Sequence, residues 1–236
     1  MTDTLLLVGR AHVSAVAQRH AARLRERGVA DAVAVATYDE DPAELAPAVE
    51  GTPYVVPLAA APGRDTMQSI PGALPAARHC APVGTNPAVT RALADRAREA
   101  LSPGADASVA LVAFGDASGT DARQTAEAHA ERLRSATAYG EVRTAYLLQN
   151  PAAECVRYNL TGERGVAVPF FVAACEETDR ALPAKLDLDR GGLAYADPLG
   201  DHKAVTDAIE AEFERARAAG SSTAAVSPVA TDGRGP

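Results

Sequence analysis

Short apolar runs recur along the chain and alternate with segments of helical periodicity. The runs are continuously apolar, as in parallel strands that are buried on both faces. After the first run, apolar side chains from Val13 to Leu24 recur at helical spacing and form one stripe. The alternation predicts an α/β fold with small parallel sheets flanked by helices. The expected strands lie at 5–8, 32–36, 54–57, 109–113, 142–148 and 166–172.

The chain also contains an internal repeat. The motif His-Ala-x-Arg-Leu-Arg begins at His20 and again at His129. A proline that opens a further helical segment follows each motif at the same spacing, at Pro42 and Pro151. A repeat of this length predicts two copies of one folded unit.

We therefore expect two tandem flavodoxin-like lobes with a cleft between them. The N-terminal lobe is placed at 1–103 and the C-terminal lobe at 104–215. The remaining residues, 216–236, are rich in Gly, Ser, Ala and Pro, without periodicity, and are predicted to form a disordered tail.

Composition narrows the range of functions that the protein could have. Of the 236 residues, 47% are hydrophobic, and the net charge is −8, which disfavours a broad phosphate-binding surface and therefore nucleic acids. The three cysteines, Cys80, Cys155 and Cys175, form no C-x-x-C pair, so neither a disulfide framework nor structural zinc is indicated. Since no leader or membrane-spanning stretch is evident, we expect a cytoplasmic protein that does not bind membranes.

The fold class also indicates where a ligand would bind. In open parallel sheets the ligand lies beyond the carboxyl ends of the strands. The loops concerned are 9–14, 60–69, 114–121 and 173–181, and two facing lobes would place them around one cleft suited to a flat macrocycle. No Gly-rich nucleotide-binding loop is present, so no organic cofactor is expected.

Four segments resemble a known family: Leu-Leu-Leu-Val-Gly at 5–9, Val-Pro-Phe-Phe-Val-Ala-Ala at 168–174, Asp-Arg-Ala-Leu-Pro-Ala-Lys-Leu at 179–186 and Tyr-Ala-Asp-Pro-Leu-Gly-Asp-His at 195–202. They are similar to the sirohydrochlorin cobaltochelatases, which are class II chelatases. The resemblance implies a lyase that inserts Co²⁺, or else Ni²⁺ or Fe²⁺, into a tetrapyrrole without ATP, in the cobalamin or siroheme pathway. It also implies a monomer or a homodimer.

In that family, histidines at the ends of the first and third strands handle the metal and accept protons from the pyrrole nitrogens. In this chain the first-strand position is occupied by Arg10 and Phe114, which cannot bind cobalt. The third-strand position is occupied by Asp65 and Glu177. A carboxylate can ligate a divalent ion and accept a proton, so the resemblance still implies metal chemistry here.

His12 lies two positions beyond Arg10 and is the candidate to replace the missing imidazole. The predicted metal-ligating and catalytic residues are therefore His12, Asp65 and Glu177. Each also has a structural interpretation, because acids commonly occupy the first turn of a helix and a histidine can lie in a loop without a partner.

Arg10, Arg64 and His202 are the predicted substrate-binding residues. Arginines bind carboxylates in bidentate fashion, and sirohydrochlorin carries many carboxylates. His202 matches a histidine of the family's Leu-Gly-x-His segment and could instead begin a helix. The remaining histidines and cysteines are interpreted as structural: His20, His79, His129, Cys80 and Cys175.

Two further functions stay open. Loss of the family's imidazoles is also typical of a non-catalytic relative that binds a tetrapyrrole or a metal, or that partners an active chelatase. A third candidate is an unrelated two-lobed protein that binds a small molecule and hinges near 102–107.

Overall fold

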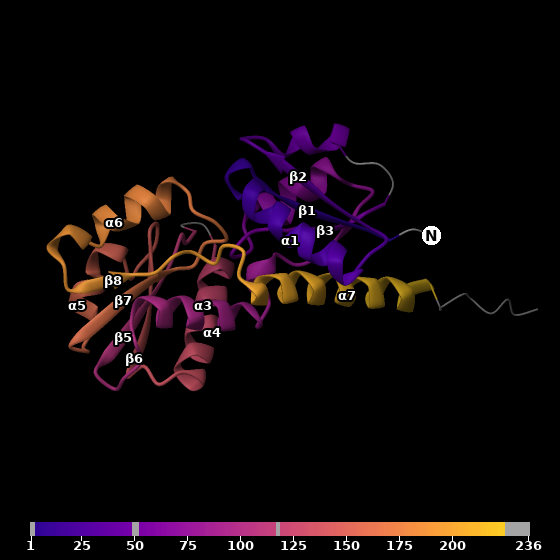
Figure 1. Ribbon diagram of the computed structural model, residues 1–236. Helices are drawn as coiled ribbons and strands as arrows, with labels where there is room; N and C mark the ends of the chain where they lie inside the picture. The colour runs from indigo at the N-terminus through magenta and orange to yellow at the C-terminus, as the bar shows by residue number, and fades with distance from the viewer. Residues whose placement is uncertain (1–2, 49–51, 117–118, 225–236) are drawn as a thin grey trace, which may run out of the picture.

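The computed structural model describes residues 3–48, 52–116 and 119–224. It contains two four-stranded, fully parallel sheets, with strand orders β2-β1-β3-β4 and β6-β5-β7-β8 (Figure 1). The strands are β1 (Thr4–Arg10), β2 (Ala32–Tyr38), β3 (Tyr54–Pro57), β4 (Arg78–His79), β5 (Ala107–Ala113), β6 (Glu141–Tyr146), β7 (Arg164–Pro169) and β8 (Leu193–Tyr195).

Helices connect successive strands. The α-helices are α1 (Ser14–Arg27), α2 (Ile70–Ala73), α3 (Val89–Ala100), α4 (Asp121–Ala136), α5 (Val156–Asn159), α6 (Leu182–Lys185) and α7 (Lys203–Ala224). Short turns of 3₁₀ or π type are η1 (Ala11–Val13), η2 (Pro42–Ala48), η3 (Asp65–Ser69), η4 (Val83–Thr85), η5 (Ala153–Cys155), η6 (Glu177–Ala181) and η7 (Leu188–Arg190). The predicted α/β class with two lobes is confirmed.

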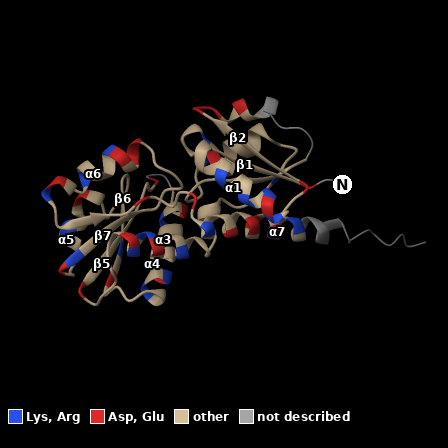
Figure 2. Cartoon of the chain, viewed as in Figure 1, with Lys and Arg blue, Asp and Glu red and all other residues tan. Residues whose placement is uncertain are grey.

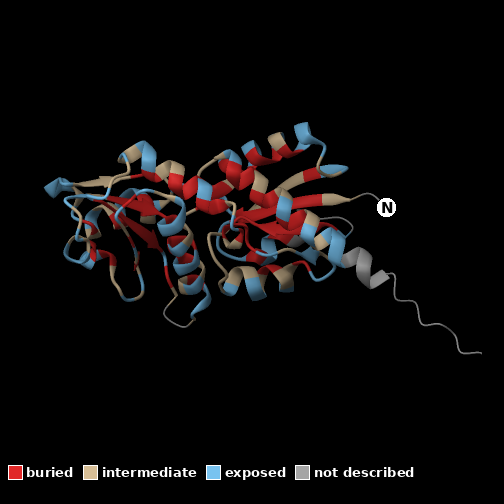
Figure 3. Cartoon of the chain, turned by 90° about the horizontal axis from the view of Figure 1, so that it is seen from below, coloured by how far each residue is buried: buried red, intermediate tan, exposed pale blue. Residues whose placement is uncertain are grey.

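Each sheet is buried on both faces, as the continuous apolar runs predict. Along β1, Leu5 and Leu7 belong to one core cluster, and Leu6 and Val8 belong to another on the opposite face. Successive side chains of a strand point to opposite faces, so a strand covered by helices on both sides must be apolar throughout. Figure 3 shows this burial in both sheets.

Two strands are shorter than the apolar runs suggest. β6 ends at Tyr146 and β7 ends at Pro169, so the expected ends at 148 and 172 are wrong. Phe170 and Val172 remain buried after the strand has ended, which keeps the sequence apolar there. Apolar character reports burial, and it does not by itself mark where a sheet ends.

The last helix of each half packs on the other half. Helix α3 packs against β7 and α4, whereas α7 packs against β3 and α1, and the two helices also contact each other. Figure 1 shows the yellow α7 lying under β1 and β3, and α3 lying beside α4. A single apolar core cluster therefore runs through both lobes, with members from α1, α3, α4 and α7. The proposed lobe limits 1–103 and 104–215 place the strands of one sheet in each lobe, but the last helix of each half, α3 or α7, packs on the other lobe.

Helix α7 extends beyond the expected end of the second lobe. It continues to Ala224, so the disorder expected from 216 is wrong up to that residue, and 225–236 lie outside the described residues. Two local contacts support the extra turns. Arg217 forms a 2.9 Å ion pair with Glu214 and lies over the Phe213 ring, 5.6 Å from its centroid. Side chains three and four residues apart lie on the same face of a helix, so both contacts stabilise these turns.

Two buried histidines join the halves. His20 Nδ1 lies 2.9 Å from Thr206 Oγ1, and His129 Nδ1 lies 2.8 Å from Thr90 Oγ1. The Nε2 atoms lie 3.2 and 2.7 Å from the carbonyl oxygens of Gly200 and Gly84, respectively. Because a carbonyl only accepts, each neutral ring carries its proton on Nε2 and accepts the threonine hydroxyl at Nδ1. Both histidines therefore have a structural role: His20 holds α7 against α1, and His129 holds α3 against α4.

Gly84→Ala is expected to destabilise the protein by about 3 kcal/mol, because the added methyl group would overlap the Ala60 backbone carbonyl. The backbone at Gly84, at Ala60 or at both would have to shift to remove this overlap. Gly72→Ala is the matched control, since nothing lies within 4 Å of its added carbon. The measurement is urea unfolding of both variants at neutral pH. Equal stability of the two variants would show that the loop at Ala60 yields without cost.

Charged side chains are distributed over the helices of both lobes, and the central strands carry few of them (Figure 2). In the described part of the chain, no helix combines the length and the apolar character that crossing a bilayer would require.

Candidate functional site

A cavity of about 690 Å³ lies where the carboxyl ends of the two sheets face each other. All four predicted loops line it, except for 117–118, which lie outside the described residues. The volume is within the usual range for small-molecule sites. The polar side chains on its lining are Arg10, His12, Tyr38, Arg64, Asp65, Thr66, Asp116, Cys175 and Glu177.

The two predicted carboxylates occupy equivalent positions. Asp65 begins the π-turn η3, and Glu177 begins the π-turn η6. In each turn the backbone N–H five residues later, of Ile70 or Leu182, donates to the carbonyl oxygen of the acid. The next residue is a proline in both copies, and proline lacks the N–H of an α-helical bond and clashes with the carbonyl four residues earlier. The widened turn follows from that proline.

A threonine next to each carboxylate fixes the loop that leads into the turn. Thr66 Oγ1 accepts the Gly63 N–H at 2.9 Å, and Thr178 Oγ1 accepts the Cys175 N–H at 2.9 Å. Each acid is therefore held on a defined turn on the cavity lining, rather than on a loose loop.

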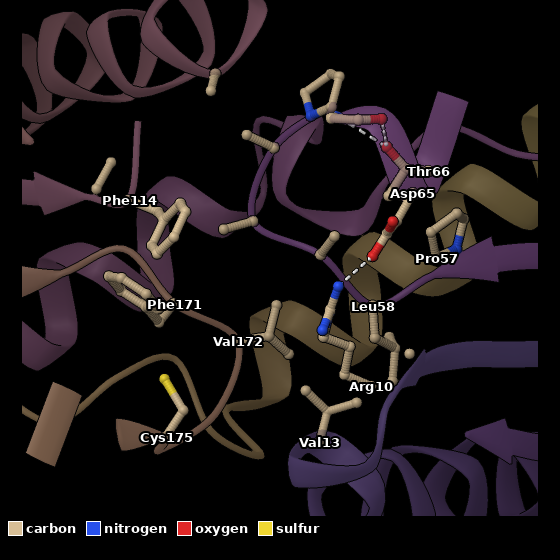
Figure 4. A pocket seen from close by; sticks show the side chains of 18 of the residues that line it. Arg10, Val13, Pro57, Leu58, Asp65, Thr66, Phe114, Phe171, Val172 and Cys175 are labelled. Carbon is tan, nitrogen blue, oxygen red and sulfur yellow. Dashed lines mark hydrogen bonds and ion pairs between the residues drawn. The ribbon is translucent and has the colours of Figure 1, made fainter. Parts of the chain in front are cut away.

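Asp65 is already paired. Its Oδ2 accepts a charged hydrogen bond from Arg10 Nη2 at 2.7 Å (Figure 4). It also accepts a bond from the Tyr38 hydroxyl at 3.1 Å. Arg10 also lies over the Tyr38 ring, 5.7 Å from its centroid. Burial and the Asp65 charge raise the pKa of Tyr38 to about 12, so the phenol remains a donor at neutral pH. The two residues that replace the first lobe's histidines thus neutralise each other.

Glu177 is in a different setting. Within the described ranges it forms no ion pair with an arginine or a lysine, and its carboxylate raises the pKa values of the Cys175 thiol and of His12. Burial lowers the pKa of His12, and Arg10 lowers it further, while Glu177 opposes the shift. His12 is therefore mostly neutral at pH 7. Burial raises the pKa of Cys175, and Glu177 adds to this, so that the thiol stays protonated.

The fourth replaced position is apolar. Phe114 is 45% exposed on the cavity lining and packs edge-to-face on Phe171, with ring centroids 6.4 Å apart. It offers neither a ligand nor a base.

Five of the six predicted site residues reach the cavity, namely Arg10, His12, Arg64, Asp65 and Glu177. The sixth, His202, does not line it. Its Nε2 lies 3.2 Å from Asp95 Oδ2, and its Nδ1 accepts the Ala204 N–H at the start of α7. This placement fits the helix-start alternative, and it gives no support to substrate binding.

The three predicted metal ligands do not form a ready-made cluster. Across residues 3–48, 52–116 and 119–224, no three His, Cys, Asp or Glu side chains are close enough together to hold an ion. Sequence reasoning also missed Tyr38 and Phe171 as cavity residues, and it placed Cys175 in the core. The ends of the second and third strands are the signal that could have found the first two.

Comparison with known proteins supports the predicted relationship. Residues 110–216 match the CbiX family model. A curated protein of Halobacterium salinarum, described as a probable sirohydrochlorin cobaltochelatase, is 25% identical over 201 residues, which are 71% of this chain and 69% of that protein. The resemblance found in the sequence is confirmed.

Solved structures share the fold. SirB from Bacillus subtilis with Fe³⁺ has a TM-score of 0.74 at 15% identity, covering 94% of this chain and 98% of that one. CbiX, described as the terminal enzyme of siroheme biosynthesis in denitrifying bacteria, has a TM-score of 0.70 at 20% identity and covers 95% and 100%. A multi-domain Deinococcus radiodurans protein with structural similarity to chelatases has a TM-score of 0.72 at 22% identity. The match covers 90% of this chain but spans only 54% of that longer protein.

Proposed function

We propose that this protein inserts a divalent metal ion into a sirohydrochlorin-type tetrapyrrole without ATP, with Co²⁺ as the expected metal and Ni²⁺ or Fe²⁺ as alternatives. The observation that carries the proposal is a cavity between two chelatase-like lobes, lined by five of the six predicted site residues. The comparisons support the expected class, a lyase of the metal-chelatase kind. We place the reaction in the cytoplasm, in cobalamin or siroheme formation, and propose a monomer or a homodimer.

Insertion requires bases as well as a site for the metal. As the metal enters, the pyrrole nitrogens lose their protons, and the metal exchanges water for nitrogen ligands. Glu177 and His12 are suited to both tasks, because a carboxylate and an imidazole can each ligate a divalent ion and accept a proton, and burial favours the neutral form of His12. Since the described residues offer no three-ligand cluster, the protein would hold the ion only in passing, and the macrocycle would supply the final ligands.

Substrate carboxylates would bind to Arg64 first. Arg64 lines the cavity and has no ion pair in the described part of the chain, whereas Arg10 is engaged by Asp65. A substrate carboxylate that reached Arg10 would compete with Asp65 and release that acid as a further base. The proposed role of Asp65 therefore depends on substrate being present.

A non-catalytic tetrapyrrole or metal carrier is the second candidate. It is favoured by the Arg10–Asp65 pair and by Phe114, which together leave three of the four family positions without a free base or ligand. A carrier would bind the macrocycle and leave it metal-free.

One experiment separates the two functions. Purified protein is mixed with metal-free sirohydrochlorin and Co²⁺, and the absorption spectrum is followed against a protein-free reaction. Insertion faster than the protein-free rate supports a chelatase. Binding of the macrocycle with insertion at the protein-free rate would leave the carrier function.

His12→Ala is expected to lower the rate of Co²⁺ insertion by about 10²-fold, as for the loss of one positioned base. Because burial lowers the pKa of His12, the parent's rate should fall only when pH drops below the ordinary histidine value of 6.5. The variant should lose this acid limb. Initial rates between pH 5 and 8 check both points.

His79→Ala is the matched control, since His79 is exposed, bonds to the Leu74 carbonyl and does not line the cavity. An acid limb that persists unchanged in the His12 variant would assign the titrating group elsewhere.

A further inference from the structure

The two walls of the cavity differ in chemistry. The N-terminal lobe contributes the wall that carries the arginines, with Arg10, Arg64 and Asp65. The C-terminal lobe contributes the apolar side chains Phe114, Leu148, Phe171 and Val172, together with the acidic side chains Asp116 and Glu177. Two of these, Phe114 at 45% and Leu148 at 55%, are among the few large apolar side chains that are strongly exposed in the described residues. Exposed apolar groups gathered in a concave site are typical of ligand binding.

The difference arises at equivalent positions of the repeat. Val8 pairs with Pro57 in one sheet, and Val112 pairs with Pro169 in the other, so that two residues further on Arg10 corresponds to Phe114. The same strand end therefore presents a cation in one lobe and an aromatic ring in the other. Figure 4 shows the Phe114 and Phe171 rings on one side of the cavity and the Arg10–Asp65 pair on the other.

The aromatic pair is held in place by its backbone. The Phe114 carbonyl accepts the Leu148 N–H at 3.0 Å, and the Phe171 carbonyl accepts the Leu199 N–H at 2.9 Å. The two rings meet at an interplanar angle of 83°, the edge-to-face geometry that aromatic pairs favour. Phe170, by contrast, is turned into the core, where it packs on His129 at 5.1 Å. Phe114 and Phe171 are thus a preformed surface on the cavity side.

We propose that Phe114 and Phe171 are specificity-determining residues on which the face of a flat conjugated ligand packs, with its carboxylates directed to the opposite, arginine-bearing wall. This deepens the proposed function and rests on it for the identity of the ligand as a tetrapyrrole. An aromatic surface favours a broad conjugated ring system, and the facing arginines favour one with acidic substituents. A linear or small carboxylate could bind the arginines but would not pack on the aromatic rings of the opposite wall.

The test measures the affinity for two metal-free macrocycles, sirohydrochlorin and uroporphyrin, by titration of their absorption and fluorescence. Phe114→Ala and Phe171→Ala are each expected to weaken binding of both by about tenfold or more. Phe114→Tyr keeps the ring and should retain the parent's affinity within about twofold. Tyr158→Ala is the matched control, because Tyr158 is 83% exposed and lies outside the cavity lining. Circular dichroism establishes that each variant is folded.

The outcomes separate this proposal from the proposed function. If the parent binds the macrocycles through these rings but inserts no metal, the chelatase function fails and the stacking surface stands. If the parent inserts Co²⁺ while both alanine variants bind as tightly as it does, the stacking surface is wrong and the chelatase function stands. If the parent binds neither macrocycle, both proposals are overturned.

Discussion

Glu177→Gln is expected to lower the rate of Co²⁺ insertion into sirohydrochlorin by about 10³-fold, within the range for loss of a positioned general base. Glutamine keeps the size and the hydrogen-bonding capacity of the side chain but removes its charge and its ability to take a proton. Binding of the metal-free macrocycle should be nearly unchanged. The measurements are initial rates by absorption and macrocycle affinity by titration.

Glu177 is expected to matter more than Asp65 because of their surroundings. The two acids begin equivalent π-turns, but Asp65 forms a 2.7 Å ion pair with Arg10, and Glu177 forms none within the described residues. A carboxylate already neutralised by a guanidinium is a poorer base and a poorer ligand. Glu177 also lines the cavity and raises the pKa values of both His12 and the Cys175 thiol.

Glu176→Gln provides the control for this prediction. Glu176 precedes Glu177 directly, is exposed and does not line the cavity, so its charge should have little effect on the rate. A Glu177 variant that inserts cobalt as fast as the Glu176 variant would remove the carboxylate from the mechanism. The pair of variants changes net charge equally, which separates a local effect from a general electrostatic one.

Mild acid is expected to destabilise the protein through His20 and His129, at a cost of about 3 kcal/mol for each once both folded and unfolded forms are protonated. Burial lowers the pKa of each ring to about 4, against 6.5 for an ordinary histidine. Protonation would also place a proton on Nδ1, where each ring now accepts a threonine hydroxyl. Each threonine hydroxyl would then have to turn from donor to acceptor, and a charged ring would lie in the apolar contact between α3 and α4 or between α1 and α7.

The sign of this pH dependence follows from the number of protons that the folded and the unfolded chain bind at each pH. Below pH 6.5 the unfolded chain binds protons at both histidines, and the folded chain does not bind them until about pH 4. Stability is therefore full above pH 6.5 and falls progressively as pH drops towards 4. Carboxylates whose pKa is lowered by hydrogen bonds, such as Glu141, lose their contribution only at lower pH. His12 and His202, whose pKa values burial also lowers, contribute in the same direction between pH 7 and 5, so variants are needed to assign the share of each buried ring.

The measurement is urea unfolding of the parent, His129→Gln and His79→Ala at several pH values. His129→Gln should be less stable at pH 7 but should show a clearly weaker pH dependence than the parent in this window, because the contribution of that ring is removed. His79→Ala should keep the full dependence, since that ring is exposed. A parent whose stability is flat between pH 7 and 5 would show that the buried rings do not respond in this way.

Much of the site could be predicted because the local pattern of apolar residues shows where each strand ends and its loop begins. The apolar runs place the strands, and parallel strands bring their carboxyl ends to one edge, so Arg10, His12, Arg64, Asp65 and Glu177 were expected near a common cleft. All five line the cavity. His202 lies outside the cavity lining, beside the start of α7, where its ring lies against Asp95, which fits the helix-start alternative.

The repeat, the two parallel sheets and the edge at which their loops meet could be predicted from the amino-acid sequence, because apolar periodicity and repeated proline spacing are local features of the chain. The packing of α3 and α7 on the opposite lobes, the Arg10–Asp65 ion pair and the Phe114–Phe171 ring pair are known only from the folded structure. Each of these contacts joins residues far apart in the chain. Their partners depend on how whole elements are placed relative to one another, and local pattern does not carry that information.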